Sequence, residues 1–194
     1  MIILASESSI RARLLRNSGI SVIVKKSTIN EYEVAKNIDN PLAKELAQKL
    51  AEEKSKEVSL RYPHALIIGC DQVLEFEGKI LHKPIHMKDA YNRLLSFSGK
   101  KHDLHSAVAF FENAQKIWSY VESASIFIRP LHSYQIHSYL ARVGIDVLKT
   151  IGVYQIEGEG IQLIEKINGD YFTIAGLPLL PLLVKLRELR IIND

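Results

Sequence analysis

The sequence is poor in cysteine: Cys70 is the only one among 194 residues. A single cysteine excludes a disulfide within the chain, and no cluster of cysteine and histidine has the spacing of zinc ligands. We therefore expect a reducing compartment. Because Cys70 directly follows the apolar run "ALIIG", we expect a buried core thiol rather than a nucleophile.

The sequence also lacks an excess of charge of one sign. Its 25 basic and 22 acidic residues give a net charge of +3, and no block of like charges resembles a binding tail. This balance gives no support to a nucleic-acid partner. No apolar run approaches the roughly 20 residues that a membrane-spanning helix needs, and the first residues do not resemble a secretory signal. We therefore expect no membrane partner and a cytoplasmic location.

The remaining composition is that of a globular protein, with 47% hydrophobic and 24% charged residues. The sequence patterns predict strands over 2–5, 21–25, 65–71, 73–76, 79–81, 101–111 and 114–128. They predict helices over 7–19, 41–58, 87–99, 133–144 and 177–189. The polar stretch 27–40 reads as a loop, and 153–176 fits no single structure. Alternating helices and strands with hairpins indicate an α/β protein with a mixed, twisted sheet flanked by helices.

The first candidate site lies in "LASESSIR", where a strand runs through a serine-rich turn into a helix. Free backbone N–H groups at such a helix start can bind phosphate. Arg11 follows Ser8 by three residues, so it lies on the same face and can clamp phosphate oxygens. The alternative is that Ser8 or Ser6 only caps the helix and Arg11 is solvated.

The second candidate is Lys54, which interrupts an apolar stripe of the helix predicted over 41–58. The stripe includes Leu50 and Val58, each four residues from Lys54. A lysine at that position must extend to solvent, find an acid or face a cleft. Extension to solvent and a functional role are both open.

The third candidate is Asp71, which ends the strand predicted over 65–71. If Glu77 and Gly78 form a two-residue turn, the returning strand brings Lys83 beside Gln72 and so near Asp71. A carboxylate and a lysine at a cleft suit water activation and charge neutralisation in phosphate chemistry. The alternative is an ion pair that closes the sheet edge.

Two further acids lie in polar segments. Glu31 could join Asp71 in binding an oxygen-seeking cation such as Mg²⁺ if the two carboxylates meet in space. Glu157, among the glycines of "YQIEGEG", could accept N–H bonds from a guanine-type base edge. Plain solvation is the alternative for each.

The order of these motifs resembles the Maf family from about Ile3 to Leu186. "LASESSIRARLL" is similar to its opening Leu-Ala-Ser-x-Ser-Pro-x-Arg, with Ser9 in place of the proline, and "INE" stands where the family has "I-D-E". "LAEEKSKEV" resembles its Leu-Ala-x-x-Lys helix. "IIGCDQVLEFEGKILHKP" is similar to its Gly-x-Asp-x-Val segment followed by Lys-Pro. "GVYQIEGEG" and "GDYFTIAGLPL" match its C-terminal motifs.

The resemblance implies a nucleoside triphosphate pyrophosphatase that releases a nucleoside monophosphate and pyrophosphate. It implies a single domain over 1–194 with two lobes around a deep cleft, as in inosine triphosphatases. A divalent cation, Mg²⁺ or Mn²⁺, is also implied, and the family often forms dimers. A house-cleaning role is implied; the family's association with arrest of septum formation leaves a nucleotide-binding regulator with little turnover as the alternative.

The resemblance also assigns roles residue by residue. Asp71 matches the proton acceptor, and Lys54 and Lys83 complete the predicted catalytic group by binding phosphate beside it. Ser8 and Arg11 match the other phosphate-binding positions.

Further positions concern the metal and the base. Glu31 matches the acidic partner of Asp71 in the metal region. Gln72 and Glu157 match the branch that acts on 7-methyl-GTP, whereas Ile10 stands where that branch typically has a large aromatic side chain. These three are the predicted base-contacting residues.

Overall fold

The structure is a computed structural model that describes residues 1–192. Its strands are β1 (Ile2–Ala5), β2 (Ile23–Val24), β3 (Leu66–Phe76), β4 (Lys79–Leu81), β5 (Lys101–Glu112), β6 (Gln115–Ile128) and β7 (Ile164–Asn168). Its α-helices are α1 (Ser9–Asn17), α2 (Glu31–Lys36), α3 (Ala43–Arg61), α4 (Met87–Phe97), α5 (Ser133–Val143), α6 (Tyr171–Ile174) and α7 (Leu179–Glu188). Two 3₁₀ helices, η1 (Gly144–Lys149) and η2 (Glu159–Leu163), complete the described chain.

The strands form one sheet in the order β2-β1-β3-β5-β6-β7, with β4 paired to β3. The pairs β2–β1 and β1–β3 are parallel, whereas β3–β4 and β6–β7 are antiparallel. The predicted α/β class with a mixed sheet and flanking helices is therefore confirmed. Within residues 1–192, no helix combines the length and apolar character needed to cross a bilayer.

The chain divides into two compact units. The first comprises Met1–Gln72, His105–Glu122 and the chain from Asp170 onward, and the second comprises Val73–Leu104 and Ser123–Gly169. Strands β3, β5 and β6 contribute to both units. A single functional domain with a cleft between two lobes stays a prediction.

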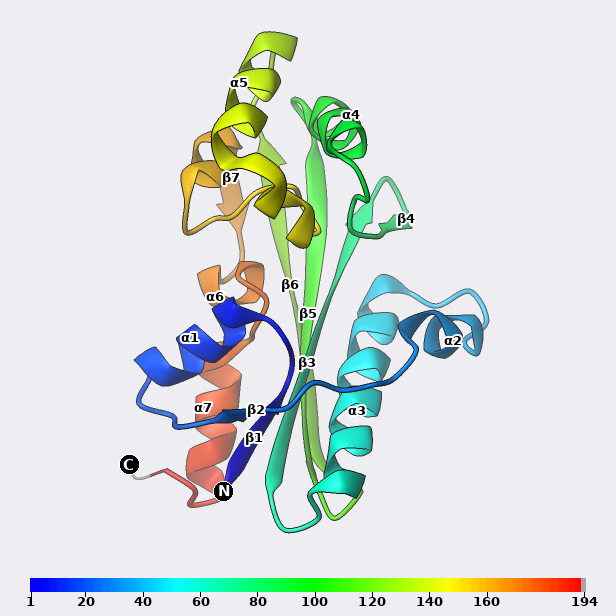
Figure 1. Ribbon diagram of the computed structural model, residues 1–194, viewed down its shortest axis with the longest axis vertical. Helices are drawn as coiled ribbons and strands as arrows, with labels where there is room; N and C mark the ends of the chain where they lie inside the picture. The colour runs from blue at the N-terminus through cyan, green and yellow to red at the C-terminus, as the bar shows by residue number, and fades with distance from the viewer. Residues whose placement is uncertain (193–194) are drawn as a thin grey trace. The chain divides into compact units, whose positions relative to one another are not determined.

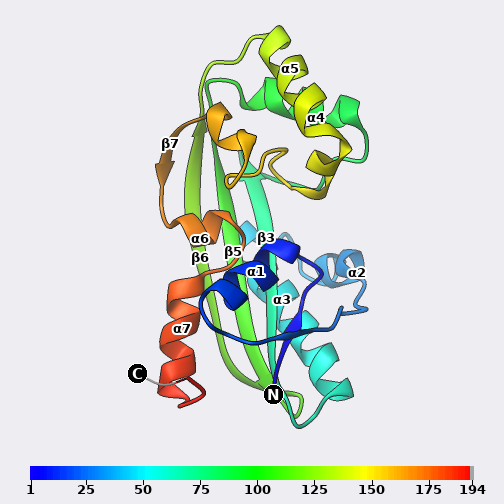
Figure 2. The ribbon, with the colours of Figure 1, turned by 60° about the vertical axis from the view of Figure 1, so that its left-hand side comes forward.

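In the first unit, helices cover both faces of the strands. Helices α1 and α7 lie on one face and α3 on the other, as the two ribbon views show (Figures 1 and 2). The face toward α1 and α7 buries an apolar cluster that includes Leu4, Leu15, Ile68, Phe110 and Leu182. Burial of each such side chain stabilises the folded state by roughly 1.5–3 kcal/mol.

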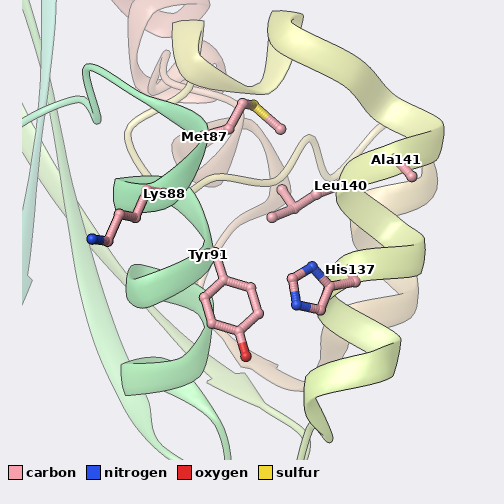
Figure 3. Close-up of a pocket in the computed structure, with 6 residues that line it drawn as sticks. All are labelled: Met87, Lys88, Tyr91, His137, Leu140 and Ala141. Carbon is pink, nitrogen blue, oxygen red and sulfur yellow. The ribbon is translucent and has the colours of Figure 1, made fainter.

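In the second unit, aromatic packing joins α4 to strands β3 and β5. The rings of Phe76 and Phe97 meet edge-on at 4.8 Å, and the His102 ring stacks on Phe97 at 4.4 Å. A pocket of about 440 Å³ lies between α4 and α5 (Figure 3). Its lining consists of Met87, Lys88, Tyr91, His137, Leu140 and Ala141, none of which is a predicted site residue.

Several local predictions were wrong. The strands predicted separately over 65–71 and 73–76 form one strand, β3, so Asp71 lies in its interior rather than at its end. The segment predicted as a loop over 27–40 contains helix α2, because Asn30 caps it by accepting bonds from the backbone N–H groups of Tyr32 (3.1 Å) and Glu33 (3.3 Å). The turn between β5 and β6 lies one residue later than predicted. Asn113 and Ala114 take the positive φ values, 48° and 59°, that such a tight turn requires.

The predicted turn between β3 and β4 is confirmed. Glu77 and Gly78 both have positive φ, and Phe76 pairs with Lys79. The ladder stops at the pair Leu74–Leu81, however, because β4 ends at Leu81. The predicted pairing of Gln72 with Lys83 is therefore wrong, and Lys83 is exposed beyond the end of the strand.

Candidate active site

Strand alternation in the middle of β3 sends neighbouring side chains to opposite faces of the sheet. Ile68 and Cys70 belong to the apolar cluster beside α1 and α7. Gly69 faces α3, so closely that a Cβ there would lie 2.2 Å from the Oγ of Ser55. Asp71 has the same parity as Gly69, so its carboxylate also points toward α3.

Lys54 projects from α3 onto this carboxylate. Its Nζ lies 2.5 Å from Oδ1 of Asp71 and 2.6 Å from Oε1 of Glu31, the first residue of α2. Only 14% of the Lys54 side chain and 11% of the Asp71 side chain are exposed, whereas Glu31 is 58% exposed. Lys54 thus interrupts the apolar stripe of α3 because it joins two acids from different elements.

Burial and charge act on this group in opposite directions. Burial raises the pKa of the Asp71 carboxyl, and the nearby charges of Lys54 and Arg11 only partly oppose that effect. Burial alone would lower the pKa of Lys54, but its attraction to Asp71 and Glu31 raises it. The lysine is therefore an ammonium at neutral pH, and Asp71 is a stronger base than an exposed aspartate.

Arg11 is held by the backbone on the α1 side of the sheet. Its Nε donates to the carbonyl oxygen of Gly176 at 2.7 Å, and its Nη1 donates to the carbonyl oxygen of Cys70 at 2.9 Å and to Oγ of Ser6 at 3.1 Å. The alternative of a freely solvated Arg11 is therefore wrong. The guanidinium has a fixed direction beside the middle of β3.

Ser8 and Ile10 lie at the start of α1. Ser8 is the helix cap, since its Oγ accepts a bond from the backbone N–H of Arg11 at 3.4 Å. Ile10 is half-buried in the first turn. The capping alternative for Ser8 is thus realised, and a role for either residue in substrate binding stays a prediction.

Gln72 contacts α6 on the face opposite to Asp71. Its Nε2 lies 3.1 Å from the carbonyl oxygens of both Thr173 and Ile174, and 2.9 Å from Oγ of Ser106. Because a carbonyl oxygen can only accept, these contacts fix the amide with its nitrogen toward α6. The side-chain oxygen of Gln72 therefore points away from that helix.

Lys83 and Glu157 belong to the second unit, and both are exposed. The structure therefore brings together Asp71, Lys54 and Glu31 in the first unit. In the same unit it places Arg11 against the carbonyl oxygen of Cys70 and Gln72 directly after Asp71. The convergence of Lys83 and Glu157 with this group stays a prediction.

A divalent cation fits the acids only in part. Two carboxylate oxygens from Glu31 and Asp71 reach one cation, the Lys54 ammonium, and oxygen is the ligand that Mg²⁺ and Mn²⁺ take. Among the described residues, no group of three or more His, Cys, Asp and Glu side chains is arranged to hold a metal. The pair suits a cation that takes its other ligands from phosphates and water, as Mg²⁺ commonly does.

Sequence reasoning missed the residues that support this site. Thr173 is buried, and its Oγ1 donates to Glu122 at 2.7 Å while its carbonyl accepts from Ser106 at 2.7 Å. Gly176, with φ of +100°, supplies the carbonyl that orients Arg11. Ser106, a polar residue before the apolar run "AVAFF", was one available signal, and the motif "GDYFTIAGLPL", which contains Thr173 and Gly176, was another.

Comparison with known proteins places the chain in a family. The family model described as Maf-like protein matches residues 1–189. The 7-methyl-GTP pyrophosphatase of Bartonella quintana (strain Toulouse) is 56% identical over 193 residues, covering 100% of this chain and 98% of that protein. The protein of the same name from Brucella suis biovar 1 (strain 1330) is 44% identical, covering 99% of this chain and 98% of that protein.

Among solved structures, the nucleoside-triphosphatase / dITP/XTP pyrophosphatase of Mycobacterium abscessus is weakly similar. The TM-score is 0.43 at 17% identity, over 96% of this chain and 93% of that chain. The family match spans nearly all of the sequence, and the two curated relatives are aligned with it from end to end. The chain therefore belongs to the Maf family.

Proposed function

We propose that this protein hydrolyses a nucleoside triphosphate to the monophosphate and pyrophosphate, with 7-methyl-GTP as the leading substrate candidate. The names of its relatives support this activity. The observation that carries it is the buried Asp71 carboxylate, held by Lys54 and oriented from the middle of β3 toward α3. A buried acid of raised pKa beside fixed cations is typical of catalytic sites.

In the proposed reaction, Asp71 accepts a proton from a water molecule. The water oxygen forms a bond to the α-phosphorus, and the bond from that phosphorus to the bridging oxygen breaks, so that pyrophosphate leaves. Lys54 keeps Asp71 in place, and Arg11 and Lys83 neutralise phosphate oxygens. Glu31 and Asp71 would hold the divalent cation. A bound cation would supply charge neutralisation on the triphosphate.

Base selection is assigned to Gln72, Glu157 and Ile10. The fixed amide of Gln72 offers its oxygen as an acceptor for a base N–H group, and the carboxylate of Glu157 is an acceptor of the same kind. A site that hydrogen-bonds one base discriminates against others, because a wrong base leaves polar groups unpaired. Ile10 would supply apolar contact rather than aromatic stacking.

The test is a panel of triphosphates assayed for pyrophosphate release with Mg²⁺ or Mn²⁺. The panel contains 7-methyl-GTP, GTP, ATP, UTP and dTTP. We expect release of pyrophosphate, not orthophosphate, with the highest kcat/KM for 7-methyl-GTP. Absence of pyrophosphate release from every member would overturn the activity, whereas a preference for UTP would overturn only the base assignment.

A further inference from the structure

The segment 151–160, which carries Glu157, has little regular structure, yet half of its residues are buried. Gly152, Val153, Tyr154, Ile156 and Gly160 are buried, whereas Glu157 and its neighbour Gly158 are exposed. Three elements of the second unit hold the first part of this segment. On the α4 side, Nη1 of Arg93 donates to the carbonyl oxygen of Ile151 at 2.7 Å.

Val153 adopts a backbone conformation that is unfavourable for its residue type. Its φ is +61°, although a β-branched residue is a rare occupant of the left-handed region. The side chain is fully buried, and the carbonyl oxygen accepts a bond from the Tyr139 hydroxyl on α5 at 3.2 Å. Strain of this kind persists only where the surroundings hold the chain, and it is concentrated at functional segments.

Tyr154 anchors the same segment to strand β5. Its hydroxyl oxygen lies 2.6 Å from Nε2 of His102, a buried side chain whose Nδ1 has no hydrogen-bond partner among the described residues. The Tyr154 ring lies so close to Gly152 that a Cβ there would be 2.6 Å from a ring carbon. The ring position therefore depends on the glycine before Val153 and on the imidazole.

The turn around Glu157 is closed just after these anchors. The N–H of Gly158 donates to the carbonyl oxygen of Gln155 at 3.1 Å. A Cβ on Gly160 would lie 2.5 Å from the backbone nitrogen of Gln155, so only glycine fits there. Glu157 thus projects from a short turn whose direction is set by Gln155, directly after Tyr154.

We propose that Val153 and Tyr154 are positioning residues for base selection: they fix the direction of the turn that presents Glu157, and neither touches the nucleotide. The proposal rests on the proposed function, in which Glu157 accepts a bond from the base. The contact with His102 holds Tyr154 in place, and the hydrogen bond from the Tyr139 hydroxyl holds the backbone of Val153.

The test compares Tyr154→Phe with Tyr134→Phe, the same change at an exposed ring of α5. The measurement is the ratio of kcat/KM for 7-methyl-GTP to kcat/KM for UTP in one preparation. Partial unfolding lowers both values equally, so the ratio does not respond to a merely structural defect. We expect Tyr154→Phe to lower the ratio by up to about tenfold, the effect of losing the hydrogen bond between Glu157 and the base, with kcat for UTP unchanged. Tyr134→Phe should keep the wild-type ratio.

Two further variants keep the outcome clear. Tyr139→Phe removes the bond to Val153 and should lower the ratio in the same direction. Glu157→Gln is measured beside them as the reference for base selection. If Glu157→Gln changes the ratio and neither tyrosine variant does, the positioning role is overturned while the proposed function stands. If Glu157→Gln also leaves the ratio unchanged, base selection by Glu157 is overturned, and the positioning role with it.

Discussion

Lys54 on α3 and Asp71 on β3 form an ion pair of 2.5 Å whose two side chains are both nearly buried. They lie seventeen positions apart in the chain, and the packing of α3 on Gly69 brings them together. Exposed ion pairs contribute little to stability, but an ion pair removed from water is costly to break on one side only. The pair therefore links the fold of the first unit to the proposed chemistry.

Asp71→Asn tests the proton acceptor. The amide keeps the shape of the side chain but cannot take a proton from water. We expect pyrophosphate release to fall about 10²- to 10⁴-fold, while nucleotide affinity measured by calorimetry stays near the wild-type value. An equal loss of affinity and turnover would instead limit Asp71 to a structural or metal-holding role, with no role as proton acceptor.

Lys54→Met tests the buried pair through stability. The methionine leaves Asp71 without its cation, so the free energy of unfolding in urea should fall by about 3–5 kcal/mol. The double variant Lys54→Met/Asp71→Asn removes the uncompensated charge and should recover part of that loss. Strictly additive costs in this double-mutant cycle would show that the two side chains are not coupled.

Gly176→Ala tests the orientation of Arg11. At φ of +100° an alanine is strained, and relaxation of the backbone would move the carbonyl that accepts from Arg11. Gly19→Ala is the matched control, since Gly19 has φ of +82° with open space around it. We expect both variants to lose about 1 kcal/mol of stability, and only Gly176→Ala to raise KM for the triphosphate. A raised KM in both would remove Gly176 from the site.

Because the imidazole of His102 is buried, we expect the protein to lose stability in acid. Burial lowers its pKa to about 4, so between pH 6.5 and pH 4 the unfolded chain binds a proton that the folded chain does not. The contribution of neutral His102 is complete above pH 6.5 and is lost as the pH falls toward 4, a change of about 3 kcal/mol. Urea unfolding at several pH values should show a shallower decline for His102→Gln. Parallel declines would contradict this origin.

The sequence predicted the elements that follow simple periodicity. The α3 stripe revealed Lys54 as an exception, and the exception proved to be an ion pair. Helix α2 was missed because none of its residues is buried, so it has no apolar stripe to detect. The Asn30 cap and the acids of its first turn were the only local signals.

Only those residues of the candidate site whose side-chain type stands out at its position could be predicted from the sequence. Asp71 and Lys54 were found because a charge stands where an apolar residue is expected. Gly176 and Thr173 contact Arg11 and Gln72 through backbone oxygens, which residues of every type carry. Their segment, 153–176, contains 3₁₀ helix, a short strand and a four-residue helix, none long enough to give a period.

Asp71 and Gln72 are adjacent in the chain, but their side chains point to opposite faces of the sheet. The acid proposed for hydrolysis and the amide proposed for base selection therefore have separate surroundings. The side chain at 72 can be exchanged for another without disturbing the partners of the acid at 71, since each faces a different layer of helices. With the roles proposed for these two residues, preference for a nucleobase can diverge while the hydrolytic step is retained. Insertion of one residue into this strand, by contrast, would reverse both orientations at once.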